Sequence, residues 1–470
     1  MYLWNIYIIC LILNTSSALF ISWLRNKLSI RKPPQYMPKY IQEPHKKQFF
    51  GMIGPNIHPE NVKTLFDLFT GDGIIHGVFI NGKNITFTKH LIQTEKIKNE
   101  ENLTISEIQL SEKLETKLFK YFNYLIGFQK WNNLGVANTA ILPLSQPVDE
   151  NTTAAYALFE RDKPYLLHFY HNTSTISTIG KVNTSFCLSG HSKKVINTLG
   201  EHTIETIDYH IFQKKVMYYS LDENLTQVLS SVEINTRYIP IIHDFLSTKD
   251  NIVIIDSPLF LDLPKLCNGK LPIKFDKQLP TFIHVIHKNT GSISTYKVNS
   301  AFYVFHFAKY TESYNQIEIY APMYDDIDFD SINIKGKYRK IVIDRYHKTA
   351  YVCNNVETEK YNLDFPVIDA FGDVILRNIE RRKINGFVKT DSDMSITQKW
   401  MFNDIFFCGE PISVCFNRKN GLIAFGNMDN VKESNNTGGI VLLNMEDGTV
   451  LRYQVGTNLT MGFHTVSISR

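Results

Sequence analysis

Cysteine is scarce in this sequence, and its scarcity excludes several kinds of small, cross-linked or zinc-bound domain. The 470 residues contain six cysteines, and no two of them form a Cys-x-x-Cys pair. A zinc ribbon and a dense disulfide framework are therefore excluded. Structural thiols are the favoured interpretation, although Cys408 and Cys415 could pair across a hairpin in an oxidising compartment.

An excess of charge of one sign is also missing. Lysine and arginine number 50 against 46 acidic residues, so the net charge is +4. Because no dense basic block occurs beyond the start of the chain, a nucleic-acid partner is not predicted. We find no Gly-rich nucleotide loop, and therefore expect neither a nicotinamide nor a flavin cofactor. A Pro/Gly/Ser-rich linker is absent as well, so we expect residues 36–470 to form a single domain.

Long apolar runs are confined to the start of the chain, in residues 1–35. This segment fits either a cleaved signal peptide, with small residues near Ser17, or an uncleaved anchor of about 23 residues. The flank containing Arg25 and Lys27 would leave the body of an anchored protein in the cytosol. Asn-x-Ser/Thr sequons instead favour a lumenal or secreted body. We predict membrane association, in the endoplasmic reticulum or secretory pathway, with the side undecided. The sequons begin at Asn84, Asn102, Asn151, Asn172, Asn183, Asn224, Asn435 and Asn458.

Beyond residue 50, short β-branched and aromatic runs separated by turn signals predict an all-β protein. A barrel, a sandwich pair or a propeller would each fit. Helical spacing predicts one helix over Ile105–Ile126. Ser257–Leu266 is apolar and broken by prolines, which indicates either a buried loop or an exposed patch that enters a bilayer. The predicted strands are Gly77–Ile80, Val216–Leu221, Asn251–Asp256, Thr281–His287, Phe302–Phe307, Gln316–Tyr320, Arg339–Asp344 and Gly439–Leu443, and the turn signals are Asn81-Gly82, Asn268-Gly269, Asn420-Gly421 and Asp447-Gly448.

Four histidines stand alone in distant, strand-like contexts. They are His191, His243, His306 and His464. Compact zinc or calcium motifs place their ligands a few residues apart, whereas a site gathered from several sheets needs wide spacing. A lone histidine is more often a hydrogen-bonded core or surface residue than a ligand. The surrounding motifs decide between these interpretations. We interpret His76, His284 and His287 as structural.

These motifs recur in a fixed order along nearly the whole body of the chain. In that order they resemble the carotenoid cleavage oxygenase family, which includes the retinal pigment epithelium isomerohydrolase. The resemblance runs from about Gly51 to the C-terminus. The motifs are Gly54-Pro55-Asn56, Phe69 to Gly77, Asn138-Thr139-Ala140, Leu158-Phe159-Glu160, His243-Asp244-Phe245, Phe305-His306, Leu363-Asp364-Phe365-Pro366, Gly409-Glu410-Pro411 and Gly462-Phe463-His464.

The resemblance implies a seven-bladed β-propeller with short helical insertions and Fe(II) on its axis. It makes the four histidines above the iron ligands, and it gives three carboxylates behind them, those of Glu160, Asp364 and Glu410, the role of accepting their free ring N–H groups. Asp364 stands where the family has glutamate. Because its side chain is one methylene shorter, we expect it to reach its histidine only through a water molecule or a backbone shift.

Other positions also depart from the family pattern. Ser192, Lys309 and Thr465 replace the proline, asparagine and glycine that the resemblance predicts, yet all four ligand positions keep histidine. Phe159 stands where the stilbene-cleaving branch would have lysine, which favours a non-phenolic polyene.

The resemblance therefore implies a non-haem Fe(II) dioxygenase that uses dioxygen to cleave a conjugated double bond of a carotenoid or apocarotenoid to carbonyl products. Its partners would be a lipophilic polyene and a membrane surface. One alternative is isomerohydrolysis of a retinyl-type ester on the same iron site. Another is a propeller that binds a lipophilic ligand without turnover.

Overall fold

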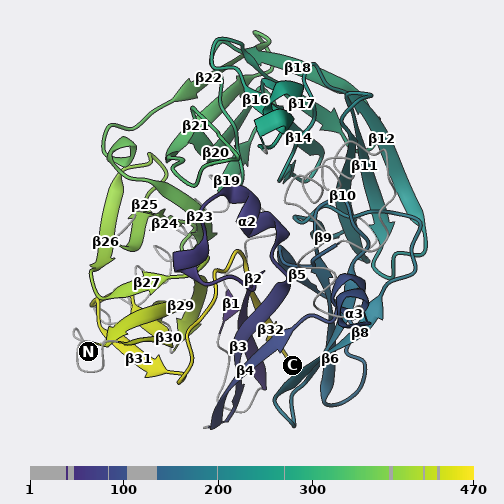
Figure 1. The fold of residues 1–470 in the computed structure, drawn as a ribbon. Coiled ribbons are helices and arrows are strands. Elements are labelled where there is room, and N and C mark those ends of the chain that lie inside the picture. The colour runs from purple at the N-terminus through teal and green to yellow at the C-terminus, as the bar shows by residue number, and fades with distance from the viewer. Residues whose placement is uncertain are drawn as a thin grey trace, which may run out of the picture.

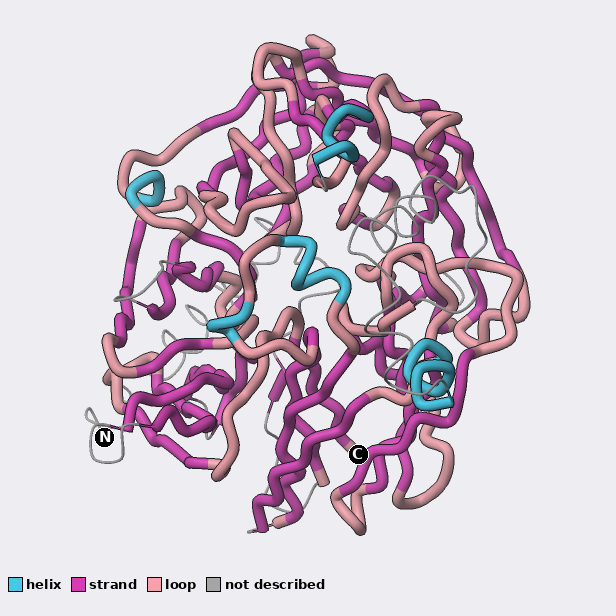
Figure 2. Tube along the Cα trace, in the orientation of Figure 1, coloured by secondary structure: helices cyan, strands magenta, loops and turns pink. Residues whose placement is uncertain are grey.

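The computed structural model describes residues 39–40, 47–82, 84–102, 135–197, 200–268, 270–379, 385–416, 419–430 and 435–470. Strands dominate this part of the chain and helices are few, as the tube in Figure 2 shows. Seven sheets surround a central axis as the blades of a β-propeller (Figure 1). The predicted fold class is therefore confirmed.

Each blade contains an antiparallel sheet of four strands that follow one another from the axis outward. The first is β32 (Thr465–Ser469), β2 (Gln48–Pro55), β3 (Gly73–Asn81) and β4 (Asn84–Leu91). The second is β5 (Ala140–Pro143), β6 (Thr152–Leu158), β7 (Tyr165–Tyr170) and β8 (Thr175–Lys181). The third is β9 (Lys193–Ile196), β10 (His202–His210), β11 (Lys215–Asp222) and β12 (Val228–Asn235). The fourth is β13 (Leu246–Ser247), β14 (Asn251–Asp256), β17 (Thr281–His287) and β18 (Ile293–Val298).

The remaining three blades follow in chain order. The fifth is β19 (Lys309–Glu312), β20 (Gln316–Tyr324), β21 (Gly336–Asp344) and β22 (Thr349–Cys353). The sixth is β23 (Leu363–Ile368), β24 (Val374–Ile379), β25 (Asn385–Thr390) and β26 (Ile396–Phe402). The seventh is β28 (Ile412–Phe416), β29 (Lys419–Asn430), β30 (Asn435–Asn444) and β31 (Val450–Gln454), to which β1 (Lys39–Tyr40) and β27 (Ile405–Phe407) add.

Short elements lie between these strands. A small hairpin, β15 (Leu259–Leu261) and β16 (Ile273–Phe275), stands apart from the blades. The helices in the described ranges are α2 (Leu65–Thr70), α3 (Glu95–Asn102), η1 (Pro59–Asn61), η2 (Leu263–Asn268) and η3 (Thr358–Lys360). In Figure 1, α2 crosses the middle of the ring.

The last strand of the chain closes the ring. β32 pairs antiparallel with β2, with Met52 opposite Thr465 and Phe50 opposite Ser467. The first blade therefore combines the last strand of the chain with three strands from near its start, and hydrogen bonds rather than a covalent link join them. This pairing also places His464, the residue before β32, beside the axis.

The core lies between neighbouring blades, because each sheet is covered on both faces. Phe49 and Phe79 of the first blade meet Phe169 of the second, and all three side chains are fully buried. Burying one such side chain contributes about 1.5–3 kcal/mol. Two covered faces also explain why β6 and β14 are buried at every position, without the alternation of a one-sided sheet.

One predicted strand and one predicted turn are wrong. Phe302–Phe307 forms a connection in which only Tyr303 makes an isolated bridge, to Tyr324. Its apolar side chains are buried because the segment crosses between two packed clusters, not because it extends a sheet. Asn420-Gly421 lies inside β29, where Gly421 pairs with Val414 and Asn444. A Cβ at Gly421 would lie 3.0 Å from the Leu443 carbonyl oxygen, so close strand approach explains this glycine.

Other predictions have mixed outcomes. The hairpin closed by Asp447-Gly448 is confirmed, since β30 pairs with β31 and Gly448 has a φ of 73°. Ser257–Leu266 forms β15 and the start of η2 rather than a plain loop; Leu259 is buried and Leu263 is 55% exposed. Cys408 and Cys415 are free thiols, so the disulfide is not formed. Cys415 lies within β28, where its backbone pairs with Asn420 and Tyr40.

Three predictions fall wholly or partly outside the described residues: the helix over Ile105–Ile126, the leader at residues 1–35, and the turn at Asn268-Gly269, whose second residue is not described. In the part of the chain that is described, no helix is both long and apolar enough to cross a membrane.

Candidate metal centre

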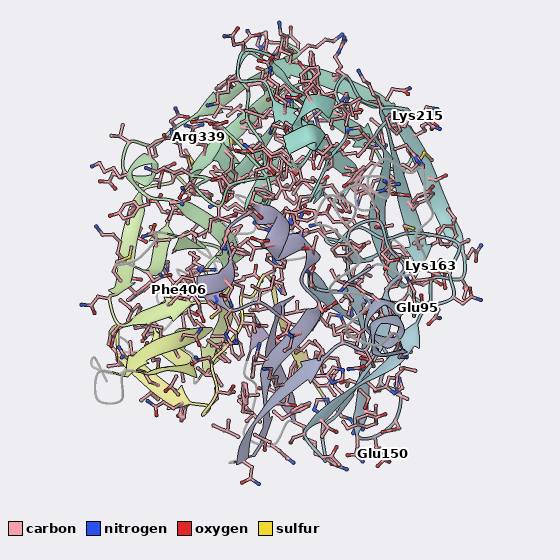
Figure 3. The ribbon with its side chains drawn as sticks, in the orientation of Figure 1. Glu95, Glu150, Lys163, Lys215, Arg339 and Phe406 are labelled. Atoms are coloured by element: carbon pink, nitrogen blue, oxygen red, sulfur yellow. The ribbon has the colours of Figure 1, made fainter. Side chains whose placement is uncertain are left out.

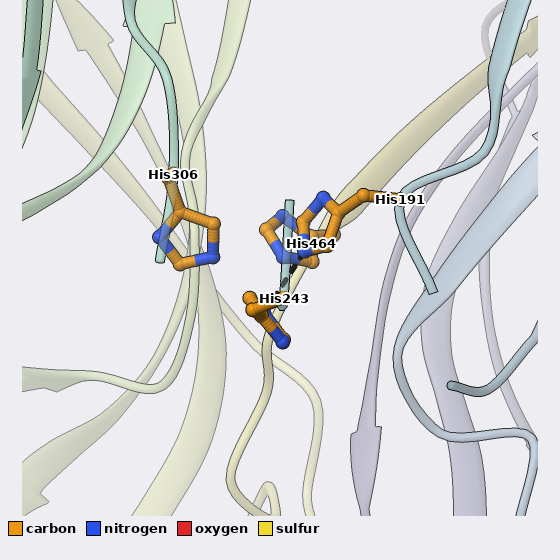
Figure 4. A group of neighbouring side chains, drawn as sticks. All are labelled: His191, His243, His306 and His464. Atoms are coloured by element: carbon orange, nitrogen blue, oxygen red, sulfur yellow. Dashed lines mark hydrogen bonds between the residues drawn. The ribbon is translucent and has the colours of Figure 1, made fainter. Parts of the chain in front are cut away.

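Four imidazoles meet at the axis although their residues lie far apart in sequence. His191, His243, His306 and His464 each occupy the connection that enters an innermost strand, β9, β13, β19 and β32 respectively. Innermost strands converge on the axis, so residues just before them point toward one another. One ligand atom from each ring lies within 4.8 Å of all the others (Figure 4). The strand-like contexts expected for these histidines are therefore wrong, but the structure brings all four together.

Carboxylates fix which nitrogen of three rings faces the centre. The Nδ1 atoms of His243, His306 and His464 lie against Glu160, Asp364 and Glu410. Their Nε2 atoms consequently face inward. His191 Nε2 and His243 Nε2 are 3.0 Å apart, and the dashed line in Figure 4 marks this contact.

The pKa values of two of the rings favour neutral imidazole, the form that binds a metal cation. Burial, reinforced by the neighbouring imidazoles, lowers the pKa of His191 well below its usual value. Burial likewise lowers the pKa of His464. Neutral imidazole presents a lone pair to the centre, as a metal ligand must.

His306 differs from the other rings, because its pKa is raised. Burial opposes its protonation, but the Asp364 carboxylate outweighs that effect. Its Nε2 atom is buried and has no hydrogen-bond partner among the described residues. A buried polar atom without a partner is costly, and a metal ion would satisfy it. Inward imidazole nitrogens suit iron, zinc, copper or nickel, so the residues present fit a transition-metal ion.

Asp364 reaches His306 because the backbone of β23 shifts locally. The register between β23 and β24 is irregular between Asp364 and Val367, and Phe365 has a φ of 53°. A bulge with an unusual backbone conformation re-aims a side chain. Asp364 Oδ1 lies 2.7 Å from His306 Nδ1, and Tyr324 donates to Oδ2 at 2.5 Å. Of the two expected arrangements, the backbone shift is the one observed.

Glu410 holds its histidine less closely. Its Oε2 atom lies 3.5 Å from His464 Nδ1 but accepts hydrogen bonds from the Thr465 backbone N–H at 2.9 Å and the Thr465 hydroxyl at 3.1 Å. Glu160, by contrast, contacts His243 Nδ1 directly, and its other oxygen accepts a hydrogen bond from Tyr209 at 3.3 Å. Tyr209 and Tyr324 carry no recognisable sequence signal, so only the structure identifies them.

Aromatic side chains lie close to the histidine rings. Phe69 and Phe305 lie 6.3 and 5.3 Å from the ring of His243, and Phe365 lies 5.0 Å from that of His306. Phe463 lies 6.4 Å from Phe69. We name these four phenylalanines the aromatic wall. Each lies in one of the motifs identified in the sequence, but the motifs do not reveal that these side chains lie near the histidines.

Helix α2 carries Phe69 and is fixed at both ends. Thr64 caps its start by accepting from the Asp67 backbone N–H, while the Asp67 carboxylate accepts from the Thr64 backbone N–H. The Asn138 amide donates to the Gly71 carbonyl at 2.8 Å just past its end. Asn138 comes from the predicted Asn-Thr-Ala motif, so part of that motif anchors the helix over the site.

A cavity of about 210 Å³, lined by both polar and apolar side chains, adjoins the imidazoles. It contacts His191, His306 and His464, and its walls come from the innermost strands of several blades. Lys193 and Asp244 form an ion pair in its wall. The centre therefore adjoins both this cavity and the phenylalanines of the aromatic wall.

Other residues that the sequence singled out lie outside this cluster. His284 contacts Asp256 at 3.3 Å and Thr295 at 3.0 Å. His76 contacts Thr460, and Asp72 pairs with Lys96. None belongs to the group of metal-competent side chains found among the described residues. Figure 3 shows how densely side chains fill the space between the blades.

Comparison with known proteins gives one family. The sequence model of the retinal pigment epithelial membrane protein family matches residues 50–466. The carotenoid 9,10(9′,10′)-cleavage dioxygenase of Crocus sativus is 23% identical over 372 residues, which cover 73% of this chain and 65% of that protein. A chloroplastic 9-cis-epoxycarotenoid dioxygenase of Oryza sativa subsp. japonica is 21% identical over 50% of this chain and 42% of its own length. The chain thus spans less than two thirds of these relatives.

Solved structures show the same fold. A variant of the Synechocystis apocarotenoid oxygenase superposes with a TM-score of 0.69 at 18% identity, covering 95% of this chain and 98% of that one. The lignostilbene dioxygenase of Pseudomonas brassicacearum superposes with a TM-score of 0.67 at 15% identity, covering 93% and 95%.

Proposed function

Because the chain belongs to the family of the retinal pigment epithelial membrane protein and the carotenoid cleavage oxygenases, we propose that it is a non-haem Fe(II) dioxygenase. Its substrate would be a carotenoid or apocarotenoid, cleaved at one conjugated double bond. Both atoms of dioxygen enter the products, so one C=C bond becomes two C=O groups.

The observation that carries this proposal is the convergence of four imidazoles whose outer nitrogens lie against three carboxylates. We propose His191, His243, His306 and His464 as the iron ligands. Neutral ligands do not themselves offset the positive charge of a divalent metal, in contrast to carboxylate ligands, so the carboxylates behind the rings would offset it. Iron held there would supply the redox chemistry that dioxygen addition requires.

The protein's own residues would orient the imidazole rings and the substrate and would exclude water. Glu160, Asp364 and Glu410 hold three imidazole rings by accepting their Nδ1 protons, so that Nε2 stays available. The aromatic wall offers an apolar surface for a conjugated chain and keeps water from the rings beside it. Fixing one double bond near the centre is a positioning task, and positioning alone can supply several kcal/mol of the barrier.

The test is an assay of the purified, iron-loaded full chain with apocarotenals under ¹⁸O₂. Oxidative cleavage predicts shorter carbonyl products with label in both fragments, measured before solvent exchange. An iron-loaded protein that converts no polyene under these conditions would contradict the proposal and favour a propeller that only binds a lipophilic ligand.

A second reaction on the same residues is isomerohydrolysis of a retinyl-type ester, because the matching family model is named for the retinal pigment epithelial protein. In that reaction water, not dioxygen, supplies the oxygen atom. Turnover of a retinyl ester under argon, with label incorporated from H₂¹⁸O, would identify it; no turnover without dioxygen would exclude it.

We also propose that the protein associates with a membrane of the endoplasmic reticulum or secretory pathway. Residues 2–13 are almost wholly apolar, and a lipophilic substrate would be concentrated in a bilayer. Fractionation of cells expressing the full chain tests this. Recovery of the protein wholly in the high-speed supernatant would contradict membrane association.

A further inference from the structure

Arg377 is a cation buried in the protein interior close to the candidate metal centre. It lies on β24, its relative exposure is 2%, and its Nε atom has no hydrogen-bond partner among the described residues. Within those residues no carboxylate forms a salt bridge with it, whereas buried Arg339 pairs with Asp325 and Glu359. An unpaired buried charge costs several kcal/mol. Arg377 therefore calls for a physical reason.

Packing accounts for part of that reason. The guanidinium carbon lies 5.6 Å from the ring centre of Phe365 and 5.8 Å from that of Phe406. Such cation–π contacts stabilise a buried cation in part. They are smaller than the usual cost of desolvating a cation. If packing were the whole reason, a neutral side chain of similar length would serve as well.

Position links Arg377 to the histidines. It stands directly opposite Asp364 in the pairing of β24 with β23. Asp364 contacts His306, and Phe365, whose ring the guanidinium approaches, lies 5.0 Å from His306 and 5.8 Å from His464. The ring of Phe365 therefore contacts both the guanidinium and the rings of two of the proposed ligands.

The sum of the charges near the centre indicates what the positive charge of Arg377 does there. Three carboxylates, Glu160, Asp364 and Glu410, contact ligand rings. Together with a divalent metal they leave one negative charge in excess, and Arg377 cancels it. The nearby Lys193–Asp244 pair is neutral as a whole. Although burial lowers the pKa of Arg377 to about 10, the guanidinium stays protonated at neutral pH.

We propose that Arg377 is a positioning residue of the metal centre, whose fixed positive charge balances the three carboxylates and favours the ferrous over the ferric state. A cation in a low-dielectric interior acts over longer distances than one in water. Since oxidation adds a positive charge at the axis, a buried cation nearby opposes it. This goes beyond the proposed reaction and rests on the proposed function only in requiring bound iron.

The test replaces Arg377 in the full, iron-loaded chain and measures the Fe(III)/Fe(II) midpoint potential by spectroelectrochemical titration, with the ferric state followed by electron paramagnetic resonance. Arg377→Met keeps the length of the side chain and removes the charge. We expect its potential to fall by about 59 mV or more, a tenfold shift of the oxidation equilibrium. Arg377→Gln is the second neutral variant should the methionine variant not fold, and the same fall is expected.

Three further variants separate charge from packing. Arg377→Lys keeps a positive charge and should stay close to the wild-type potential. Phe406→Leu disturbs the packing around Arg377 but keeps its charge, and Arg339→Met removes a buried arginine that pairs with Asp325 and Glu359 instead; neither should lower the potential. An unchanged potential in an iron-loaded neutral variant, or an equal fall in Phe406→Leu, would overturn the inference. Absence of iron from the wild type would instead overturn the proposed function, so the two failures are distinct.

Discussion

Thr465 donates two hydrogen bonds to the carboxylate oxygen of Glu410 that faces His464. These bonds measure 2.9 and 3.1 Å, whereas the same oxygen lies 3.5 Å from His464 Nδ1. The threonine therefore competes with the histidine for its supporting carboxylate. His306, whose Asp364 lies at 2.7 Å, is held more closely. The three supported rings are not held equally, and His464 is the most weakly supported of them.

Removing that competition should strengthen the centre. In Thr465→Ala the hydroxyl bond to Glu410 is lost, so the carboxylate can turn toward His464. Because support from behind a ligand typically changes metal affinity 10–100-fold, we expect iron loss to a chelator to slow by up to about tenfold. Thr457→Ala, at an exposed threonine, is the control. Faster iron loss in Thr465→Ala would show that the hydroxyl positions Glu410 favourably.

We expect Tyr324 to affect metal binding only through its hydrogen bond to Asp364. Tyr324→Phe removes the hydroxyl that holds Asp364 Oδ2 and leaves the ring in place. We expect about a tenfold weaker hold on iron, measured as the rate of iron loss to a chelator at fixed temperature. Tyr320→Phe is the matched control, because Tyr320 lies on the same strand and donates to Glu318. Equal rates in the two variants would contradict this role.

Removing the carboxylate behind His306 should have a larger effect. Asp364→Ala leaves the ring without its acceptor and Tyr324 without its partner. A 10–100-fold loss of metal affinity is expected, measured by equilibrium competition with a chelator of known affinity. Asp369→Ala, at a buried aspartate in the turn that follows the same strand, is the control. If Asp364→Ala binds the metal with wild-type affinity, Asp364 does not support metal binding through His306.

Stability should depend on the contacts between blades. Phe169 is fully buried against Phe49 at 5.0 Å, so Phe169→Ala should lower the free energy of unfolding by about 3–5 kcal/mol. Phe371, which is 75% exposed, provides the control, and Phe371→Ala should cost less than about 0.5 kcal/mol. Chemical denaturation followed by tryptophan fluorescence measures both. Similar losses in the two variants would contradict the core described above.

Buried neutral histidines should make the apoprotein sensitive to acid. Burial lowers the pKa of His76 to about 3 and that of His171 to about 4, against 6.5 for the unfolded residue. Between these values the unfolded chain binds more protons than the folded one, so stability rises with pH. We therefore expect the free energy of unfolding to decrease as pH falls from 6.5 toward 4. In His76→Asn this slope should be smaller; an unchanged slope would contradict the assignment.

Much of the fold could be predicted from sequence, because strand-forming runs and turn residues are local signals. Asn251–Asp256 and Thr281–His287 are strands with the predicted bounds. Phe302–Phe307 was not predictable in this way. A buried connection and a buried strand have the same apolar composition, and only the packing of neighbouring blades distinguishes them. The number of blades came from family resemblance rather than from periodicity.

The candidate site, too, could be predicted only in part from the sequence. The four histidines and three acids were identified from motifs in the sequence, and the structure brings them together. Tyr324 and Tyr209 were not, since each contacts its carboxylate from a strand distant in sequence. Arg377 was not identified either, because it belongs to none of the motifs. The bulge at Phe365 that lets a short aspartate reach His306 is also invisible in sequence, because no glycine marks it.

The central claim is that the axis of this propeller holds iron, and the iron content of the purified chain tests it most directly. Metal analysis should be made on residues 36–470 of the wild type, beside His243→Ala and the matched control His284→Ala, whose histidine contacts Asp256 instead. The account predicts about one iron per chain in the wild type and in the control, and loss of iron from His243→Ala. A wild type that binds no iron even after anaerobic loading with Fe(II) would contradict the account.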